Sequence, residues 1–371
     1  MFNRKYIKSP TQLVAILSVA LVGGVALLVS AMADEKRQLP PVNDTAGNVV
    51  QDGIVEMQQI NLGGVDQWIL VRGRSFENPV LLFLHGGPGG AIMPWVDLFQ
   101  SAKLEEQFTI VHWDQRGSGK SFSPELTVDD VRPEKFVADT LELTAYLQKW
   151  FGKEKIFLAG QSWGSALGFM VIAENSSPYH AFVPISERVE WHRSLKMGYD
   201  WAVDQAKANN DDEILKRLQA IEPFDALDEA DLVVQREALD YYRGGDYHTE
   251  GLGPKYLDYA LSGQSPYYSD EDIQKYMPGL ELSSRGIEVP EIVGNYDLFK
   301  TYPIADIPVH FITGADDQNT PADLAREYYE FIEAPQKSFT TIDEAAHMVM
   351  FDQPDAWAEA LIAIKKRVVG K

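Results

Sequence analysis

The length, composition and charge of the 371-residue chain exclude several classes of protein. With 45% hydrophobic and 24% charged residues, the chain has the composition of an ordinary globular protein that can form a full core. It contains no cysteine, which excludes disulfides, thiolate nucleophiles and zinc–thiolate sites. The formal net charge of −22 argues against a nucleic-acid-binding protein, because such a protein needs a basic face.

Residues 1–33 differ in composition from the rest of the chain. Three basic residues come first, and no further charged residue follows until Asp34. The apolar run between them ends in Ala31-Met32-Ala33, which places small residues where a signal peptidase reads them. Because the run is longer than a usual signal core and close to the length of a membrane span, we expect a cleaved signal peptide or an uncleaved membrane anchor. In both cases the remainder is extracytoplasmic, and residues 34–53, rich in proline, glycine and asparagine, are expected to form a linker.

Strand and helix patterns then alternate from residue 54 to residue 186. Two alternating runs around Gly63-Gly64 predict a hairpin. Short, solidly apolar runs predict buried parallel strands, and a helical pattern with an early proline lies among them. The expected elements are the hairpin at 55–62 and 65–71, strands at 79–84, 108–113, 156–159 and 181–185, and a helix at 133–151. This alternation predicts a mostly parallel sheet covered by helices on both faces.

The alternation stops between residues 187 and 302. This part is rich in Trp, Tyr, Asp and Glu and shows helical patterns, such as 211–221 and 231–243, without a strong strand. Strands at 307–313 and 338–342 and helices at 321–331 and 354–368 follow it. We therefore predict an α/β core formed by residues 54–186 and 303–371, with a helical cap, residues 187–302, inserted before the penultimate strand.

The segment Gly160-Gln161-Ser162-Trp163-Gly164 joins an apolar strand to a helical pattern. Ser162 is therefore expected on a sharp strand–helix turn, with small glycines two residues before and two residues after it. This G-x-S-x-G context is that of a nucleophile elbow. The helix that begins here would also direct its amides and its positive dipole end at a developing oxyanion.

A serine nucleophile needs a base, and the base needs an orienting carboxylate. Asp317 follows the strand at 307–313, and His347 follows the strand at 338–342. Both residues thus lie at the carboxyl edge of the sheet, as Ser162 does. We predict a triad of Ser162 as nucleophile, His347 as general base and then acid, and Asp317 as the residue that orients the histidine.

From about Val55 to its end, the chain resembles the α/β-hydrolase superfamily, and proline iminopeptidases in particular. The segments that carry the resemblance are His85-Gly86-Gly87-Pro88-Gly89, Asp114-Gln115-Arg116-Gly117-Ser118-Gly119 and Gly160-Gln161-Ser162-Trp163-Gly164-Ser165. The chain departs from that group at Gln161, where glycine is more common, and at Ala346, where a glycine usually precedes the histidine. The family's Gly-x-x-Asp-x-x-x-Pro spacing falls on Asp317 and not on Asp316.

The resemblance implies the α/β-hydrolase fold and a serine peptidase that removes an N-terminal residue through an acyl-enzyme, with no cofactor and no metal. It places the oxyanion hole at the backbone amides of Gly87 and Trp163, with Gly86 assisting. It implies structural roles for Asp114 and Arg116. Iminopeptidases hold the amino terminus of their substrate with carboxylates of the lid, for which the candidates in the insertion are Glu187, Glu190 and Glu237.

Two other functions remain open. A carboxylesterase or lipase would use the same triad, and a binding protein could retain the fold without catalysis. The intact triad argues against the binding protein, and Ser162 excludes an aspartate nucleophile at the elbow. The expected partner is a small peptide or ester and not a nucleic acid, and the sequence does not specify an oligomeric state.

Overall fold

The computed structural model describes residues 38–221, 229–287 and 296–370. The segment predicted as a signal peptide or membrane anchor therefore lies outside the described residues. Within those three ranges, no helix combines the length and the apolarity needed to cross a membrane.

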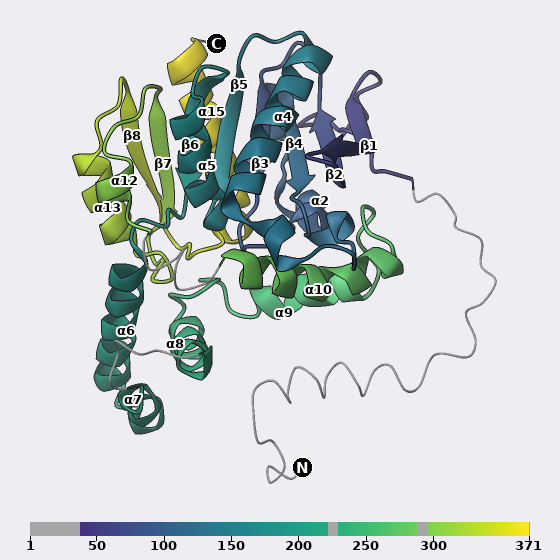
Figure 1. Cartoon of the computed structure of the whole chain (residues 1–371). Coiled ribbons are helices and arrows are strands. Elements are labelled where there is room, and N and C mark those ends of the chain that lie inside the picture. Colours follow the sequence, from purple (N-terminus) through teal and green to yellow (C-terminus); the bar gives the residue numbers. More distant parts are fainter. Residues whose placement is uncertain (1–37, 222–228, 288–295, 371) are drawn as a thin grey trace, which may run out of the picture.

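An eight-stranded sheet forms the centre of the domain (Figure 1). The strand order is β1-β2-β4-β3-β5-β6-β7-β8. The pairs β1/β2 and β2/β4 are antiparallel and all other pairs are parallel, which confirms the predicted mostly parallel sheet. The strands are β1 (Ile54–Leu62), β2 (Val65–Gly73), β3 (Val80–Leu84), β4 (Thr109–Asp114), β5 (Ile156–Gln161), β6 (Tyr179–Ile185), β7 (Val309–Gly314) and β8 (Lys337–Ile342).

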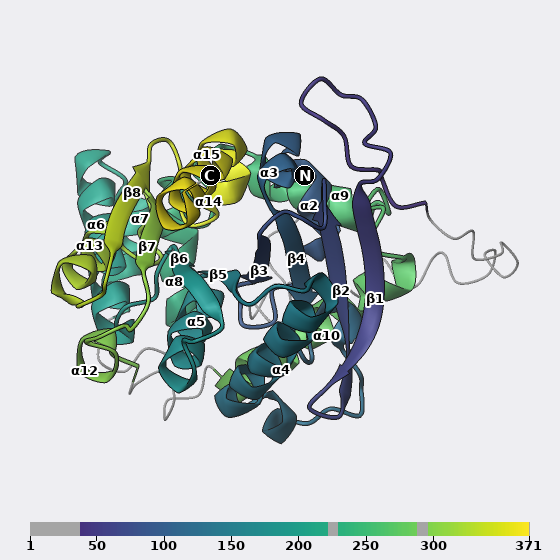
Figure 2. The same cartoon turned by 90° about the horizontal axis from the view of Figure 1, so that it is seen from above.

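Helices cover both faces of the sheet, because successive side chains of a strand point to opposite faces (Figure 2). Leu82 and Leu84 of β3 belong to one hydrophobic cluster, and Leu81 and Phe83 belong to the other. The first cluster includes side chains of α4 (Pro133–Phe151), α5 (Trp163–Glu174), α12 (Leu298–Thr301) and α13 (Ala322–Phe331). The second includes side chains of α2 (Val96–Phe99), α3 (Ala102–Gln107), α14 (Val349–Asp352) and α15 (Pro354–Val369). Short 3₁₀ turns lie in the loops after β3 and β4: η1 (Met93–Trp95), η2 (Gly119–Ser121) and η3 (Val128–Val131).

The described part of the expected linker, residues 38–53, is mostly exposed but is held against the domain near Pro40, Pro41 and Val42. The Val42 side chain is only 1% exposed. The Arg72 guanidinium donates hydrogen bonds to the carbonyls of Pro40 and Pro41 at 2.7 and 3.3 Å, and it also pairs with Glu105 at 2.6 Å. The local composition suggested a linker because the partners of this segment lie further along the chain, in β2 and α3.

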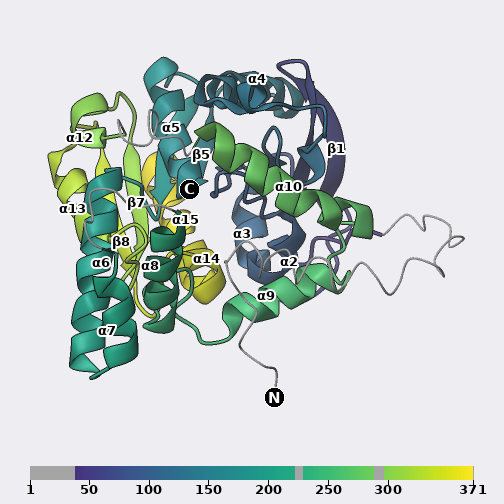
Figure 3. The same cartoon turned by 60° about the horizontal axis from the view of Figure 1, so that its bottom comes forward.

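The described residues between β6 and β7 form helices that lie beyond the carboxyl ends of the parallel strands (Figures 1 and 3). These helices are α6 (Trp191–Ala208), α7 (Asp212–Gln219), α8 (Glu229–Tyr241), α9 (Leu252–Leu261) and α10 (Asp270–Ile287). Helix α10 lies directly on the glycine-rich loops of the core. A Cβ atom at Gly89 would be 2.9 Å from the Leu280 Cα atom, and one at Gly279 would be 2.7 Å from the Gly117 oxygen. The cap therefore closes over the strand ends that carry the predicted site.

Candidate active site

Ser162 occupies a strained turn at the junction of β5 and α5. Its φ of 54° and ψ of −115° lie outside the regions that non-glycine residues usually adopt, at a cost of roughly 1–3 kcal/mol. The two flanking glycines make this turn feasible. A Cβ atom at Gly160 would be 2.1 Å from the Gly164 oxygen, and one at Gly164 would be 2.1 Å from the Leu84 oxygen. The turn therefore has the geometry that the predicted nucleophile needs.

His347 and Asp317 form a buried hydrogen-bonded pair, with 3.0 Å between Nδ1 and Oδ2. The Asp317 carboxylate also accepts bonds from the backbone amides of Asn319 and Thr320, at 3.0 and 2.8 Å, and from the Thr320 hydroxyl at 2.8 Å. Because the carboxylate accepts at Nδ1, that nitrogen carries the proton and Nε2 is left as the base. His347 and Ser162 line the same pocket.

The pKa of His347 is raised above its ordinary value of 6.5. Burial of the imidazole lowers this pKa, but the charge of Asp317 and the hydrogen bond to its carboxylate outweigh burial. The negative charge of Asp246 acts in the same direction, and the positive charge of Arg188 acts against it. The site therefore favours the imidazolium that a general base becomes when it takes up a proton.

Two side chains of the core hold the backbone of His347 by donating hydrogen bonds to its carbonyl oxygen. The Ser186 hydroxyl donates to the His347 oxygen at 2.8 Å, and the Gln161 side-chain amide donates to it at 3.4 Å. Gln161 is the residue at which the chain departs from the glycine common in iminopeptidases. Gln161 thus makes a contact to the His347 backbone that a glycine, without a side chain, cannot make.

The cap also contacts both loops of the predicted triad through Gly244, Gly245 and Asp246, which we call the cap strap. Its three carbonyls accept hydrogen bonds from the amides of Gln318 at 2.8 Å, His347 at 3.2 Å and Met348 at 2.9 Å. Gln318 lies next to Asp317, so the strap joins the aspartate loop to the histidine loop. Sequence reasoning missed the cap strap, and its only local trace is the Gly-Gly pair at 244–245.

The peptide between Gly86 and Gly87 is oriented by a buried histidine. The Gln115 amide donates to His85 Nε2 at 3.2 Å, so Nδ1 carries the proton and donates to the Gly86 oxygen at 2.8 Å. Burial lowers the His85 pKa to about 4, which keeps the ring neutral at pH 7. The Gly90 amide donates to the same oxygen at 3.1 Å.

A planar trans peptide points its N–H away from its C=O. The Gly87 amide therefore points away from His85, and both Gly86 and Gly87 line the pocket. Trp163 is the first residue of α5, so its amide has no acceptor within the helix. These two amides are the predicted oxyanion donors, and His85 is a positioning residue that sequence reasoning did not identify.

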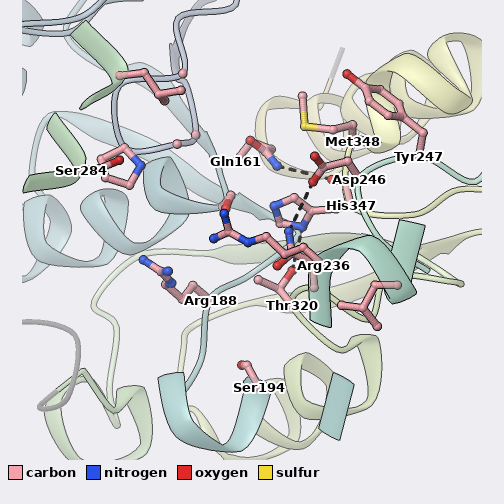
Figure 4. Close-up of a pocket in the computed structure, with 18 of the residues that line it drawn as sticks. Gln161, Arg188, Ser194, Arg236, Asp246, Tyr247, Ser284, Thr320, His347 and Met348 are labelled. Atoms are coloured by element: carbon pink, nitrogen blue, oxygen red, sulfur yellow. Dashed lines mark hydrogen bonds between the residues drawn. The ribbon is translucent and has the colours of Figure 1, made fainter. Parts of the chain in front are cut away.

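The pocket has a volume of about 360 Å³ and lies between the strand ends and the cap (Figure 4). Asp246 lies beside His347, and the side chains of Arg188 and Arg236 extend into the same space. Asp246 is the one acidic residue among the described residues that line the pocket.

The structure places none of the predicted substrate carboxylates at the pocket, which corrects that prediction. Glu187 is 2% exposed, its carboxylate accepts a bond from the Ser165 hydroxyl at 3.1 Å, and burial raises its pKa well above the ordinary value. Glu190 caps α6 by accepting from the His192 amide at 3.3 Å. Glu237 forms an ion pair with Arg217 outside the pocket.

Helical spacing explains why Glu237 faces away from the pocket. The residues of α8 that line it are Leu232, Gln235, Arg236 and Leu239, at the i, i+3, i+4 and i+7 positions of one face. Glu237 is one position beyond that face. The same spacing, applied to a helix of known orientation, would have identified Gln235 and Arg236.

No group of three or more histidine, aspartate or glutamate side chains within residues 38–221, 229–287 and 296–370 is arranged to hold a metal ion. The polar groups of the site are a hydroxyl, an imidazole, a carboxylate and backbone amides. These suit acyl transfer by nucleophilic catalysis.

Comparisons with known proteins identify the fold family of the chain. A family described as having the alpha/beta hydrolase fold matches residues 79–354. The chain is 29% identical over 310 residues to the probable aminopeptidase YbaC of Bacillus subtilis (strain 168), covering 83% of this chain and 95% of that protein. It is 34% identical over 113 residues to a proline iminopeptidase of Lactobacillus crispatus (strain ST1), which is 30% of this chain and 36% of the relative. The crystal structure of a proline iminopeptidase from Mycobacterium smegmatis superposes with a TM-score of 0.59 at 18% identity, covering 84% of this chain and 98% of that one. The chain therefore belongs to the family with the α/β-hydrolase fold.

Proposed function

We propose that the chain is an exported serine hydrolase that acts as an aminopeptidase and releases an N-terminal residue, such as proline, from its substrate. The observation that carries this proposal is the hydrogen-bonded His347–Asp317 pair in one pocket with the strained Ser162. The similarity to a probable aminopeptidase over 83% of the chain supports a peptide substrate.

In the first half of the proposed reaction, Ser162 Oγ attacks the carbonyl carbon of the N-terminal residue. His347 Nε2 takes up the hydroxyl proton, and the Asp317 carboxylate stabilises the imidazolium. The amides of Gly87 and Trp163 bind the oxyanion of the tetrahedral intermediate, a contribution of several kcal/mol. His347 then donates its proton to the leaving amine, and an acyl-enzyme on Ser162 remains.

In the second half, water attacks the acyl-enzyme, and His347 Nε2 takes a proton from that water. The same two amides bind the second oxyanion. When the intermediate collapses, His347 returns the proton to Ser162 Oγ and the free amino acid leaves. Both halves thus need a neutral His347 at the start of the step.

An aminopeptidase must also hold the free ammonium group of its substrate while the neighbouring carbonyl is attacked. Asp246 fits this role, since its carboxylate lines the pocket beside His347. The Asn319 side-chain amide orients that carboxylate through a bond of 3.4 Å. We assign to Asp246 the role that the sequence had suggested for Glu187, Glu190 or Glu237.

Blocking the substrate's amino group is expected to slow the enzyme. Proline arylamide and N-acetyl-proline arylamide would be compared by kcat/KM on the purified enzyme. The acetyl group removes a charge-assisted contact worth about 1.5–3 kcal/mol, so the blocked substrate should react at least about tenfold more slowly.

Asp246→Asn should remove most of this difference, because the acceptor is then uncharged. Asp316→Asn is the matched control: Asp316 pairs with His248 at 3.0 Å and does not line the pocket, so the difference should persist. Equal rates on blocked and free arylamides would refute the aminopeptidase. Together with turnover of short-chain aryl esters, they would establish an esterase that uses the same residues.

Export is the second part of the proposal and rests on the basic start and apolar run of residues 1–33. Fractionation of cells that produce the full-length chain, followed by N-terminal sequencing, tests it. A mature protein that starts at Asp34 indicates a cleaved signal, and an intact Met1 in the membrane fraction indicates an anchor. A soluble, cytoplasmic, full-length protein would contradict both.

A further inference from the structure

We propose that Arg236 binds a carboxylate of the substrate, so that the substrates of this pocket are short peptides that carry both terminal charges. The inference rests on the proposed aminopeptidase function. It specifies that the substrate carries a negatively charged carboxylate in addition to its ammonium group. It assigns a binding role to a residue of α8 that takes no part in the reaction steps above.

Arg236 offers an exposed guanidinium to the pocket. It lines the pocket from α8, and its side chain extends into the space in front of His347 (Figure 4). The Asp240 carboxylate, one helical turn further along, accepts a hydrogen bond from the Asp246 amide at 2.8 Å, and the positive charge of Arg236 acts to lower its pKa. Among the residues that the structure describes, no carboxylate forms an ion pair with Arg236.

The described residues that line the pocket include two arginines and one acidic residue. These are Arg188, Arg236 and Asp246, whereas the whole chain has a formal net charge of −22. The Arg188 guanidinium stacks on the Trp191 ring at 4.2 Å, and its charge reaches the site, where it lowers the pKa of His347. Arginine side chains in the described lining of an otherwise acidic protein favour an anionic group on the ligand.

On the side of the pocket formed by α6 and α8, two buried polar side-chain atoms have no hydrogen-bond partner among the described residues. The Gln235 side-chain nitrogen donates to the Leu195 oxygen at 2.8 Å, which fixes the amide and leaves its Oε1 as a buried acceptor without a hydrogen bond. The Ser194 hydroxyl, 4% exposed, is also unpaired and lines the same wall. Buried polar atoms of this kind are normally paired, so the wall is suited to a ligand with donors and acceptors of its own.

The size of the pocket suits a short peptide. A volume of about 360 Å³ is at the lower end of the roughly 300–1,000 Å³ of small-molecule sites. The side chains of Asp246 and Arg236, both partly open to solvent, carry opposite charges at this pocket, as the two termini of a short peptide do. A charge-assisted hydrogen bond to each terminus is stronger than a bond between neutral groups. Asp246 serves the ammonium group and Arg236 the carboxylate.

The test compares a proline-led dipeptide with the same dipeptide amidated at its C-terminus. For the wild-type enzyme, kcat/KM should be about tenfold higher for the free acid, because only the acid makes the charge-assisted contact. In Arg236→Met the ratio should fall to about one, and in Arg236→Lys, which keeps the charge but not the two-pronged geometry, it should lie in between. Arg217→Met is the matched control, since Arg217 is an arginine of the neighbouring helix that pairs with Glu237 outside the pocket, and it should keep the full ratio.

Equal rates of the wild type on acid and amide would overturn the proposal, and so would an unchanged ratio in Arg236→Met. If neither dipeptide is cleaved while aryl esters are, the aminopeptidase function has failed and Arg236 is tested separately. The same variants are then compared on a nitrophenyl hemisuccinate and a nitrophenyl butyrate. A preference for the anionic ester that depends on Arg236 supports carboxylate binding, and its absence refutes it.

Discussion

Ser162→Ala is expected to lower kcat by about 10⁶-fold, because no other group at the elbow can form the acyl-enzyme. The loss should affect kcat and not the fold, since the Ser162 backbone supplies the structural contacts of the turn. Its amide donates to the Ile185 oxygen at 3.0 Å, and its carbonyl accepts from the Ser165 and Ala166 amides at 2.9 and 3.2 Å. Alanine keeps all three. The thermal unfolding midpoint should therefore stay near that of the wild type.

Covalent labelling provides the control for this prediction. A fluorophosphonate should modify the wild-type enzyme stoichiometrically at Ser162 and leave the alanine variant unmodified. Ser284→Ala, which removes another serine hydroxyl that lines the pocket, should be labelled as the wild type is. Stoichiometric modification of any other residue would show that Ser162 is not the nucleophile.

Asp317→Asn is expected to lower kcat by about 10⁴-fold, because the amide no longer fixes the histidine tautomer or stabilises the imidazolium. The charge of Asp317 is the main influence that raises the pKa of His347 against burial. Without that charge the neutral imidazole persists to lower pH. The acidic limb of the residual kcat/KM profile should therefore move to lower pH than in the wild type.

Asp316→Asn tests whether the assignment to Asp317 is correct. Asp316 is 43% exposed at its side chain, and its carboxylate faces His248 of the cap and not His347. Its loss should lower kcat only slightly. A large loss in Asp316→Asn with a small one in Asp317→Asn would transfer the orienting role to Asp316.

The elements of the core were predictable because their signals are local. A strand buried on both faces reads as a short apolar run, and the helix predicted at 133–151 is observed as α4 with those bounds. The common location of Ser162, Asp317 and His347 could be predicted for a related reason. Each follows a predicted strand, and the carboxyl ends of parallel strands meet at one edge of a sheet.

The residues of the cap that face the site were not predictable in the same way. Which face of α8 meets the pocket depends on how α6 and α8 pack. The places of Glu237 and Arg236 in the sequence do not show that orientation. Asp246 lies in a turn without periodicity, and its place beside His347 results from backbone hydrogen bonds to loops about 70 and 100 residues further along the chain. The contact of His85 could not be predicted either. Its ring orients the Gly86–Gly87 peptide through a hydrogen bond to the Gly86 oxygen, and the sequence does not show that contact.

The cap strap also limits how the specificity of this protein can be changed, whether by evolution or by design. A cap that is inserted between two strands suggests that it could be replaced by the cap of another hydrolase while the core is kept. Here the exchange would remove the carbonyls that hold the amides of Gln318, His347 and Met348. With a grafted cap, the pocket would be new, but the His347 loop would have lost backbone hydrogen bonds that hold it in place. Residues 244–246 therefore belong with the core in any such chimaera, and single substitutions on α6 and α8 are a more accessible route to new substrates than the transfer of a whole cap.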